Sequence, residues 1–233
     1  MGHDLDHDLA RYARQVRFAP LGEEGQRRLN AGRVLLCGCG ALGTAIANIM
    51  VRAGVGLLRI VDRDFVELSN LQRQTLFDEA DAKAGLPKAI AAAEKLRTIN
   101  SAVSIEPIVA DIEPANIERL CDGVDLILDG TDNFETRFLI NDVAVKLGLP
   151  WVYGGCVGAE GQSMTILPGE TGCLRCLMAD CPQPGSTPTC QSAGILAPIV
   201  GVIASIEAME AIKILSGHRE AVSQSLTVVD LWP

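Results

Sequence analysis

Short apolar runs and helical patterns alternate along most of this chain. The first run, at 33–37, leads directly into the glycine motif G-x-G-x-x-G, and a helical pattern follows at 45–52. Strands that alternate with helices typically form a parallel sheet with helices on both faces. Further strands are predicted at 56–62, 104–109, 124–129, 150–155, 161–167 and 225–229. Further helices are predicted at 87–99, 114–120, 134–147 and 197–216, with two short ones within 8–31 that break near Pro20.

The last third of the chain departs from this alternation. Residues 168–194 carry four of the eight cysteines and show little periodicity. We therefore predict an α/β protein with a Rossmann-like, doubly wound, mostly parallel sheet. A mixed or antiparallel C-terminal extension and a Cys-containing crossover loop are expected to follow it.

The glycine motif is the first candidate site. Gly38, Gly40 and Gly43 follow a buried strand and open a helix, where free N–H groups and the helix dipole favour a phosphate. Asp62 ends the next strand, where such folds hold a ribose hydroxyl. The motif is typical of many nucleotide-binding proteins, and a glycine-rich turn that binds nothing is the alternative.

Polar residues follow other strands. The loop 69–74 is near enough in sequence to reach the phosphates of the same nucleotide, although any surface loop would be polar. Lys88 follows Pro87 in the first turn of a helix, where the helix dipole disfavours a cation unless an anion lies there. Asp129 and Asp132 end a strand at the ligand edge of the sheet, and Mg²⁺ typically takes one or two carboxylates plus phosphate oxygens. Helix N-capping by Asp132 is the alternative.

Composition narrows the range of partners. The net charge of -9 argues against an extended nucleic-acid surface and against an anionic membrane. No apolar run has the length of a membrane span, and the first residues lack the pattern of a signal peptide. We therefore expect a cytoplasmic protein without nucleic-acid or membrane partners. Disulfides are not expected in that compartment, and Cys37, Cys39 and Cys121 are predicted to be core or turn residues.

Taken together, these segments resemble the ThiF/MoeB/HesA family of ubiquitin-activating-type adenylyltransferases. The resemblance extends from about residue 10 to 230, so we interpret 1–233 as a single ThiF-type adenylation domain. It comprises N-terminal helices (8–31), a nucleotide-binding core (32–150) and a carrier-binding, Cys-rich crossover region (151–233). The segments that carry it are RYARQ (11–15), GCGALG (38–43), Asp62 with Asp64, SNLQRQ (69–74), LPK (86–88), DGTDN (129–133), CLRC (173–176), TCQSAGILAPIVG (189–201) and EAMEAIKILSG (207–217).

The resemblance implies a reaction that uses ATP and Mg²⁺. The C-terminal glycine of a ubiquitin-like sulfur carrier protein ending in Gly-Gly, of the ThiS or MoaD type, attacks the α-phosphate, and pyrophosphate leaves. The adenylated carrier then serves thiamine or molybdopterin biosynthesis, with a cysteine desulfurase or a rhodanese as sulfur donor. A homodimer is also implied, in which Arg14 reaches the ATP of the other protomer. The apolar helix at 197–215 supports a dimer, because so small a monomer is expected to leave part of it uncovered.

The same resemblance assigns site residues position by position. Asp62 holds the ribose and Asp132 holds Mg²⁺, while positive groups stabilise the charge that gathers on phosphate oxygens. The implied catalytic residues are Arg14, Arg73, Lys88, Asp132 and Cys190. The implied nucleotide-binding residues are Gly38, Gly40, Ala41, Gly43, Asp62, Asp64, Ser69, Asn70, Leu71, Gln72, Arg73, Lys88, Asp132 and Asn133.

The crossover cysteines indicate two further functions. Cys173 and Cys176 have the spacing of a zinc-ligand pair, but a structural zinc site usually needs four ligands, and the second C-x-x-C pair of the family is not found in these residues. The alternatives are a second pair in a part of the native chain that this sequence does not include, a site completed by Cys181 and Cys190, or a protein without zinc. The family instead uses the position of Cys190 for a thioester or persulfide-type link to the carrier, although some members act by adenylation alone. A helix beginning near 192–195 is expected to lower the pKa of the Cys190 thiol.

Three other functions compete with carrier adenylation. Adenylation of another acceptor, such as a modified tRNA base, is disfavoured by the acidic charge. An NAD-dependent Rossmann oxidoreductase would keep the glycine turn and Asp62, but it has no use for SNLQRQ, LPK or DGTDN. A binding module with a degenerate ATP site is disfavoured because every expected polar group is present.

Overall fold

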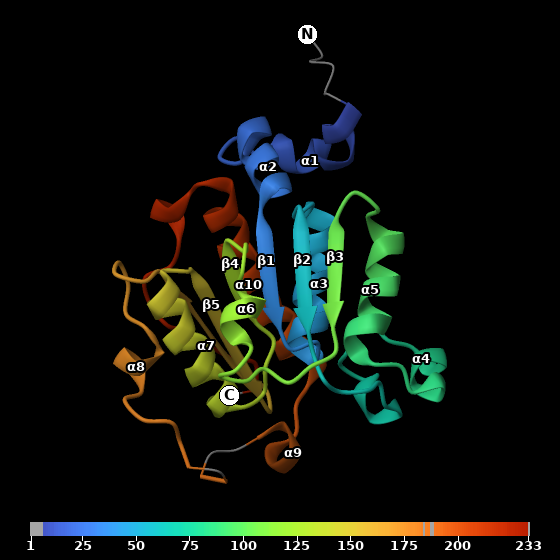
Figure 1. Cartoon of the computed structure of the whole chain (residues 1–233), viewed down its shortest axis with the longest axis vertical. Helices are drawn as coiled ribbons and strands as arrows, with labels where there is room; N and C mark the ends of the chain where they lie inside the picture. Colours follow the sequence, from blue (N-terminus) through green and yellow to red (C-terminus); the bar gives the residue numbers. More distant parts are fainter. Residues whose placement is uncertain (1–6, 184, 187–188, 233) are drawn as a thin grey trace.

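The computed structural model describes residues 7–183, 185–186 and 189–232, and a seven-stranded sheet forms its centre (Figure 1). The strand order is β3-β2-β1-β4-β5-β6-β7, parallel from β3 to β5 and antiparallel from β5 to β7. The strands are β1 (Arg33–Cys37), β2 (Leu57–Val61), β3 (Ser104–Ile108), β4 (Leu126–Asp129), β5 (Trp151–Val157), β6 (Glu160–Ile166) and β7 (Thr227–Asp230). The predicted sheet with its antiparallel C-terminal extension is confirmed.

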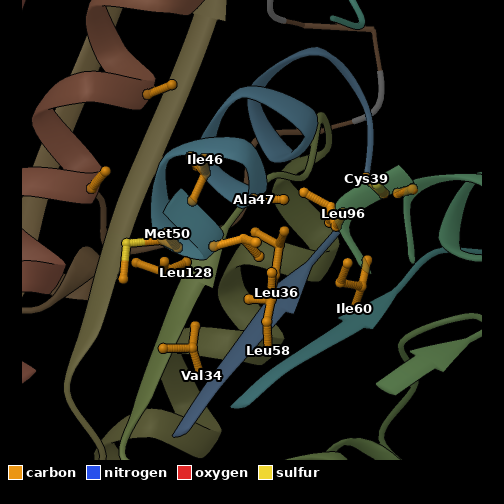
Figure 2. Close-up of a cluster of buried hydrophobic side chains, with 14 of the residues drawn as sticks. Val34, Leu36, Cys39, Ile46, Ala47, Met50, Leu58, Ile60, Leu96 and Leu128 are labelled. Carbon is orange, nitrogen blue, oxygen red and sulfur yellow. The ribbon is translucent and has the colours of Figure 1, made fainter. Parts of the chain in front are cut away.

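Helices pack on both faces of this sheet, because neighbouring strand residues point to opposite sides. Leu36 and Ile46 belong to a core between the sheet and α3, α5 and α10 (Figure 2), whereas Leu35 and Phe138 belong to a second core beneath α6 and α7. The α-helices are α1 (Ala13–Val16), α2 (Gly22–Ala31), α3 (Ala41–Ala53), α4 (Glu79–Ala84), α5 (Lys88–Ile99), α6 (Ile117–Leu120), α7 (Phe134–Leu147), α8 (Leu174–Leu177), α9 (Cys190–Ala193) and α10 (Ala197–Ser216). Short 3-10 helices are η1 (His7–Tyr12), η2 (Leu68–Asn70) and η3 (Arg219–Ala221).

The direction of winding reverses between β1 and β4. From β1 the chain adds β2 and β3 on one side, and it then returns to place β4 on the other. At such a point the loops leave in opposite directions, which opens a crevice at the carboxyl ends of the strands. The glycine motif follows β1 and the segment 129–133 follows β4, so the fold brings both to this crevice.

Some element boundaries differ from the predictions. Helix α3 begins at Ala41, four residues earlier than expected, because Gly40 of the glycine turn is its N-cap. Helix α4 was not predicted; it has no apolar periodicity and begins with a capping box formed by Asp78 and Asp81. The helix expected after Cys190 begins at Cys190 itself.

The long apolar helix α10 is buried on one side by the chain itself, while Met209 on it is 53% exposed. It packs against α3, α2, β5 and β6, and Ile199, Val200 and Ile203 on it are buried. Part of its apolar surface is thus uncovered, as expected, and the homodimer stays a prediction. Among the helices of the described residues, none has both the length and the apolar composition needed to cross a bilayer.

Candidate nucleotide site at the carboxyl ends of β1 and β4

The glycine turn after β1 packs directly on the loop after β4. Gly38 has a φ of +88°, and a Cβ on it would lie 2.6 Å from the carbonyl oxygen of Gly130. A Cβ on Gly43 would overlap the carbonyl oxygen of Gly38. Both positions therefore require glycine, because a side chain at either would collide with the neighbouring backbone. Gly38 requires it also for its positive φ.

Helix α3 begins at this turn without a side-chain cap. Gly40 occupies the N-cap position, and no side chain in the described part of the chain accepts a hydrogen bond from the first turn. The N–H groups at the start of α3, at Ala41 and beyond, therefore combine with the dipole of a 13-residue helix to favour an anion. The turn thus fits a phosphate group.

Asp62 supports the glycine turn. Its Oδ2 accepts a hydrogen bond from the backbone N–H of Cys39 at 2.6 Å, and its Oδ1 accepts one from the N–H of Asp64 at 2.7 Å. Burial raises the pKa of Asp62, while these hydrogen bonds and the charge of Lys88 oppose that rise. Each oxygen keeps a further lone pair, so a ribose hydroxyl can still bind there.

Lys88 is a buried cation, 6% exposed, at the start of α5. Its Nζ lies 3.0 Å from Oδ2 of Asp64, and its N–H donates to the carbonyl oxygen of Asp64 at 2.8 Å. The anion that the sequence indicated at this helix start is therefore Asp64. A phosphate at this place would share Lys88 with that carboxylate.

The loop 69–74 is held by its own polar groups. The buried Asn70 accepts a hydrogen bond on Oδ1 from the N–H of Glu67 at 3.1 Å, so it shapes the loop. Arg73 donates from Nη1 to the carbonyl oxygen of Ser69 at 3.0 Å and forms no ion pair with any residue in the described part of the chain. Leu71 packs on the core, while Ser69 and Gln72 are exposed. Arg73 is thus a cation whose charge is available to a ligand.

Asp132 and Asn133 have different positions at the start of α7. Asn133 is the N-cap, and its Oδ1 accepts from the N–H of Thr136 at 2.8 Å. Asp132 is exposed and makes no hydrogen bond or ion pair with any of the residues that the structure describes. The N-cap alternative for Asp132 is therefore wrong. A partnerless carboxylate at the ligand edge fits Mg²⁺, which binds few carboxylates and keeps several waters.

Arg137 is a buried cation that the sequence reasoning missed. Its Nε lies 3.3 Å from Oδ2 of Asp129, and its Nη2 donates to the carbonyl oxygens of Thr131 at 2.8 Å and Gly154 at 3.0 Å. Burial raises the pKa of Asp129, and the charge of Arg137 opposes that rise. The pair anchors the loop 129–133. The sequence did contain a signal for this pair: a carboxylate at the end of a strand and an arginine one turn into the next helix.

The crossover brings Cys190 to the same edge of the sheet. Its Sγ donates to the carbonyl oxygen of Cys156 at 3.4 Å. Burial and then the charge of Asp132 raise the pKa of this thiol, whereas Arg73 and Arg137 oppose the rise. The expected lowering is therefore wrong, because the four-residue helix α9 does not compensate for burial and a nearby carboxylate.

Cys173 and Cys176, the predicted zinc-ligand pair, lie side by side at the start of α8. Their Sγ atoms are 3.8 Å apart, the separation of about 3.8 Å expected for two thiolates on one tetrahedral zinc with Zn–S near 2.3 Å. Burial tends to raise the pKa of Cys173, but hydrogen bonds from the backbone of Cys176 and Arg175 outweigh it, so the pKa is lowered. Among the described residues no three His, Cys, Asp or Glu side chains are placed to hold a metal ion. Cys181 and Cys190 therefore do not join the pair in this structure.

Arg14 lies at the opposite end of the sheet. Helix α1 is at the amino end of β1, away from the glycine turn (Figure 1), and the five residues of β1 alone span about 16 Å. Arg14 is exposed there. It cannot reach the glycine turn of its own chain, so its implied role would need a second protomer.

Comparison with known proteins agrees with this geometry. The sequence model of the ThiF family matches residues 12–233. The sulfur carrier protein ThiS adenylyltransferase of Bacillus subtilis is 48% identical over 223 residues, which cover 95% of this chain and 65% of the relative. The molybdopterin-synthase adenylyltransferase of Escherichia coli is 39% identical over 227 residues, 97% of this chain and 89% of the relative. The structure of E. coli MccB with ATP has the same fold, with a TM-score of 0.78 at 23% identity over 95% of this chain and 70% of that one. This chain therefore belongs to the ThiF family.

Proposed function

We propose that this protein adenylates the C-terminal glycine of a ubiquitin-like sulfur carrier protein of the ThiS or MoaD type and releases pyrophosphate. The observation that carries the proposal is the convergence at one sheet edge of an uncapped helix start, two cations and a partnerless carboxylate. Similarity to the ThiS and molybdopterin-synthase adenylyltransferases supports the choice of substrate.

The residues suggest a division of roles. The first N–H groups of α3 hold a phosphate, and Arg73 and Lys88 place positive charge where phosphate oxygens become more negative. Bound Mg²⁺ neutralises charge on the phosphates, and Asp132 would hold it. The same proposal includes a homodimer in which Arg14 crosses to the other protomer. It also includes zinc on Cys173 and Cys176, and a desulfurase or rhodanese as sulfur donor.

ATP–pyrophosphate exchange tests the proposal. The protein is mixed with ATP, Mg²⁺, labelled pyrophosphate and a purified carrier that ends in Gly-Gly. We expect exchange that depends on the carrier, because its terminal carboxylate is the group that attacks the α-phosphate. A carrier without its last glycine is the control and should not support exchange. No exchange, together with thermal stabilisation by NAD and none by ATP with Mg²⁺, would support the oxidoreductase alternative instead.

Cys190→Ser should separate adenylation from any later covalent step. In that step the Cys190 thiolate attacks the carbonyl carbon of the carrier adenylate, a thioester forms and AMP leaves. We expect exchange within a few-fold of wild type and no reductant-sensitive carrier adduct. Because the thiol pKa is raised, adduct formation by the wild type should increase as the pH rises into the alkaline range.

The matched control for this experiment is Cys181→Ser, an exposed cysteine on the same crossover. It should change neither exchange nor the adduct, which is followed by non-reducing electrophoresis. An adduct that persists in Cys190→Ser would assign the nucleophile to another cysteine. A wild type that forms none would mean that the enzyme stops at the adenylate.

A further inference from the structure

Gln74 is a buried polar side chain that has no function in the site described so far. It is 3% exposed, and its Oε1 is buried without a hydrogen-bond partner among the described residues. A buried amide oxygen without a partner is costly, and folded proteins contain few of them. Such a group at the edge of a candidate site indicates a partner that arrives with a ligand.

The carboxamide of Gln74 faces the glycine turn. Its Nε2 lies 3.9 Å from the position that a Cβ on Gly40 would occupy. Apart from the chain neighbours of Gly40 and the backbone of α3, no other described atom comes within 4 Å of that position. Gly40 is also the N-cap of α3, which has no side-chain cap. One polar side chain therefore borders the open face of the turn that a phosphate would approach.

The backbone fixes Gln74 in this place. Its N–H donates to the carbonyl oxygen of Asn70 at 3.0 Å, and its own carbonyl oxygen accepts from the N–H of Phe77 at 3.2 Å. The N–H of the neighbouring Arg73 donates to the same Asn70 oxygen at 3.1 Å. One hydrogen-bonded turn therefore carries both side chains, so little ordering is needed for the carboxamide to meet a ligand.

We propose that Gln74 is a phosphate-binding residue whose Nε2 donates a hydrogen bond to a nucleotide phosphate at the start of α3. A water or hydroxyl that comes with the nucleotide gives Oε1 the partner that the protein does not supply. This inference rests on the proposed function, because it assumes that the glycine turn holds the phosphates of ATP. Gln74 would thus be a neutral hydrogen-bond donor to the phosphates, beside the cations Arg73 and Lys88.

Gln74→Met tests this contact, because methionine has similar length and lacks both polar atoms. Binding of ATP with Mg²⁺ and of adenosine is measured by calorimetry. A hydrogen bond to a charged group is worth about tenfold or more in affinity, so ATP should bind at least about tenfold more weakly, with adenosine unchanged. The midpoint of thermal unfolding without ligand should be unchanged or higher, because an unsatisfied polar group is removed.

Gln26→Met is the matched control. Gln26 is also fully buried, but its carboxamide is satisfied: Nε2 donates to Asn30 at 2.7 Å and to Ala53 at 2.9 Å, and Oε1 accepts from Gln15 at 2.7 Å. This variant should unfold at a lower temperature and keep its ATP affinity.

Three outcomes would overturn the assignment of Gln74. They are an ATP affinity of Gln74→Met within twofold of wild type, an equal loss for ATP and adenosine, or a fall in unfolding temperature like that of Gln26→Met. Failure of the wild type itself to bind ATP would reject the proposed function, so the two failures are distinguishable.

Discussion

Asp132→Asn is expected to lower the rate of ATP–pyrophosphate exchange by about 100-fold or more. The carboxylate at this position is exposed and has no partner among the described residues, so its charge is available to Mg²⁺. The amide keeps the shape and loses that charge. Asn133, the N-cap of α7, is unchanged, so the helix should stay intact. The measurement is the exchange rate at saturating carrier, together with the unfolding temperature of the variant.

Glu135→Gln is the matched control for this change. Glu135 is another exposed carboxylate, in the first turn of the same helix, and its substitution makes the same change in net charge. It should leave exchange within about twofold of wild type. Raising the Mg²⁺ concentration should recover part of the activity of Asp132→Asn. Wild-type exchange by Asp132→Asn would remove Asp132 from the reaction.

The second large effect concerns Glu207, a fully buried glutamate on α10. Neither carboxyl oxygen has a hydrogen-bond partner among the described residues, and the carboxyl lies so close to Gly154 that a Cβ there would overlap it. Burial and the charge of Asp129 raise its pKa well above the usual range, while Arg137 opposes the rise. Tyr153, on the neighbouring strand β5, also interacts electrostatically with Glu207.

The sign of the resulting pH dependence follows from proton binding. The folded protein keeps the Glu207 proton at pH values where the unfolded chain, with a pKa of about 4.3, has lost it. The free energy of unfolding therefore falls as the pH rises from about 4.3 toward the raised folded value, by up to about 1.4 kcal/mol per pH unit. Glu207→Gln removes this slope, so it should become more stable relative to wild type as the pH rises. Urea unfolding at about pH 5 and about pH 8 measures the difference.

Glu210→Gln is the control, because Glu210 is a buried glutamate close by on the same helix that does have partners. Its Oε2 accepts from Oγ1 of Thr165 at 3.0 Å and from the N–H of Ser223 at 2.8 Å, and its Oε1 pairs with Lys213. Its substitution should cost about 1–3 kcal/mol of stability. A Glu207→Gln variant with the wild-type pH slope would show that Glu207 does not hold the extra proton.

The sequence by itself determined the sheet, the glycine turn and the edge of the sheet that carries the candidate site. These features depend on local patterns: apolar runs of strand length, glycines where the backbone must turn or approach closely, and polar segments at the ends of strands. For the same reason α10 could be predicted with its observed limits, 197–216. Short helices such as α4 were missed because hydrogen bonds at their caps hold them, without an apolar period.

Only the tertiary structure decided how the polar groups of the site are paired. Lys88 meets Asp64, Arg137 meets Asp129, and the raised thiol pKa of Cys190 reflects burial and the charge of Asp132. The Lys88–Asp64 pair and the interaction of Cys190 with Asp132 join segments that are distant in the sequence, so no local pattern contains them. Packing likewise distinguishes two buried glutamates on α10. Glu207 faces Gly154 on β5 and finds no hydrogen-bond partner among the described residues, whereas Glu210 meets Thr165 on β6.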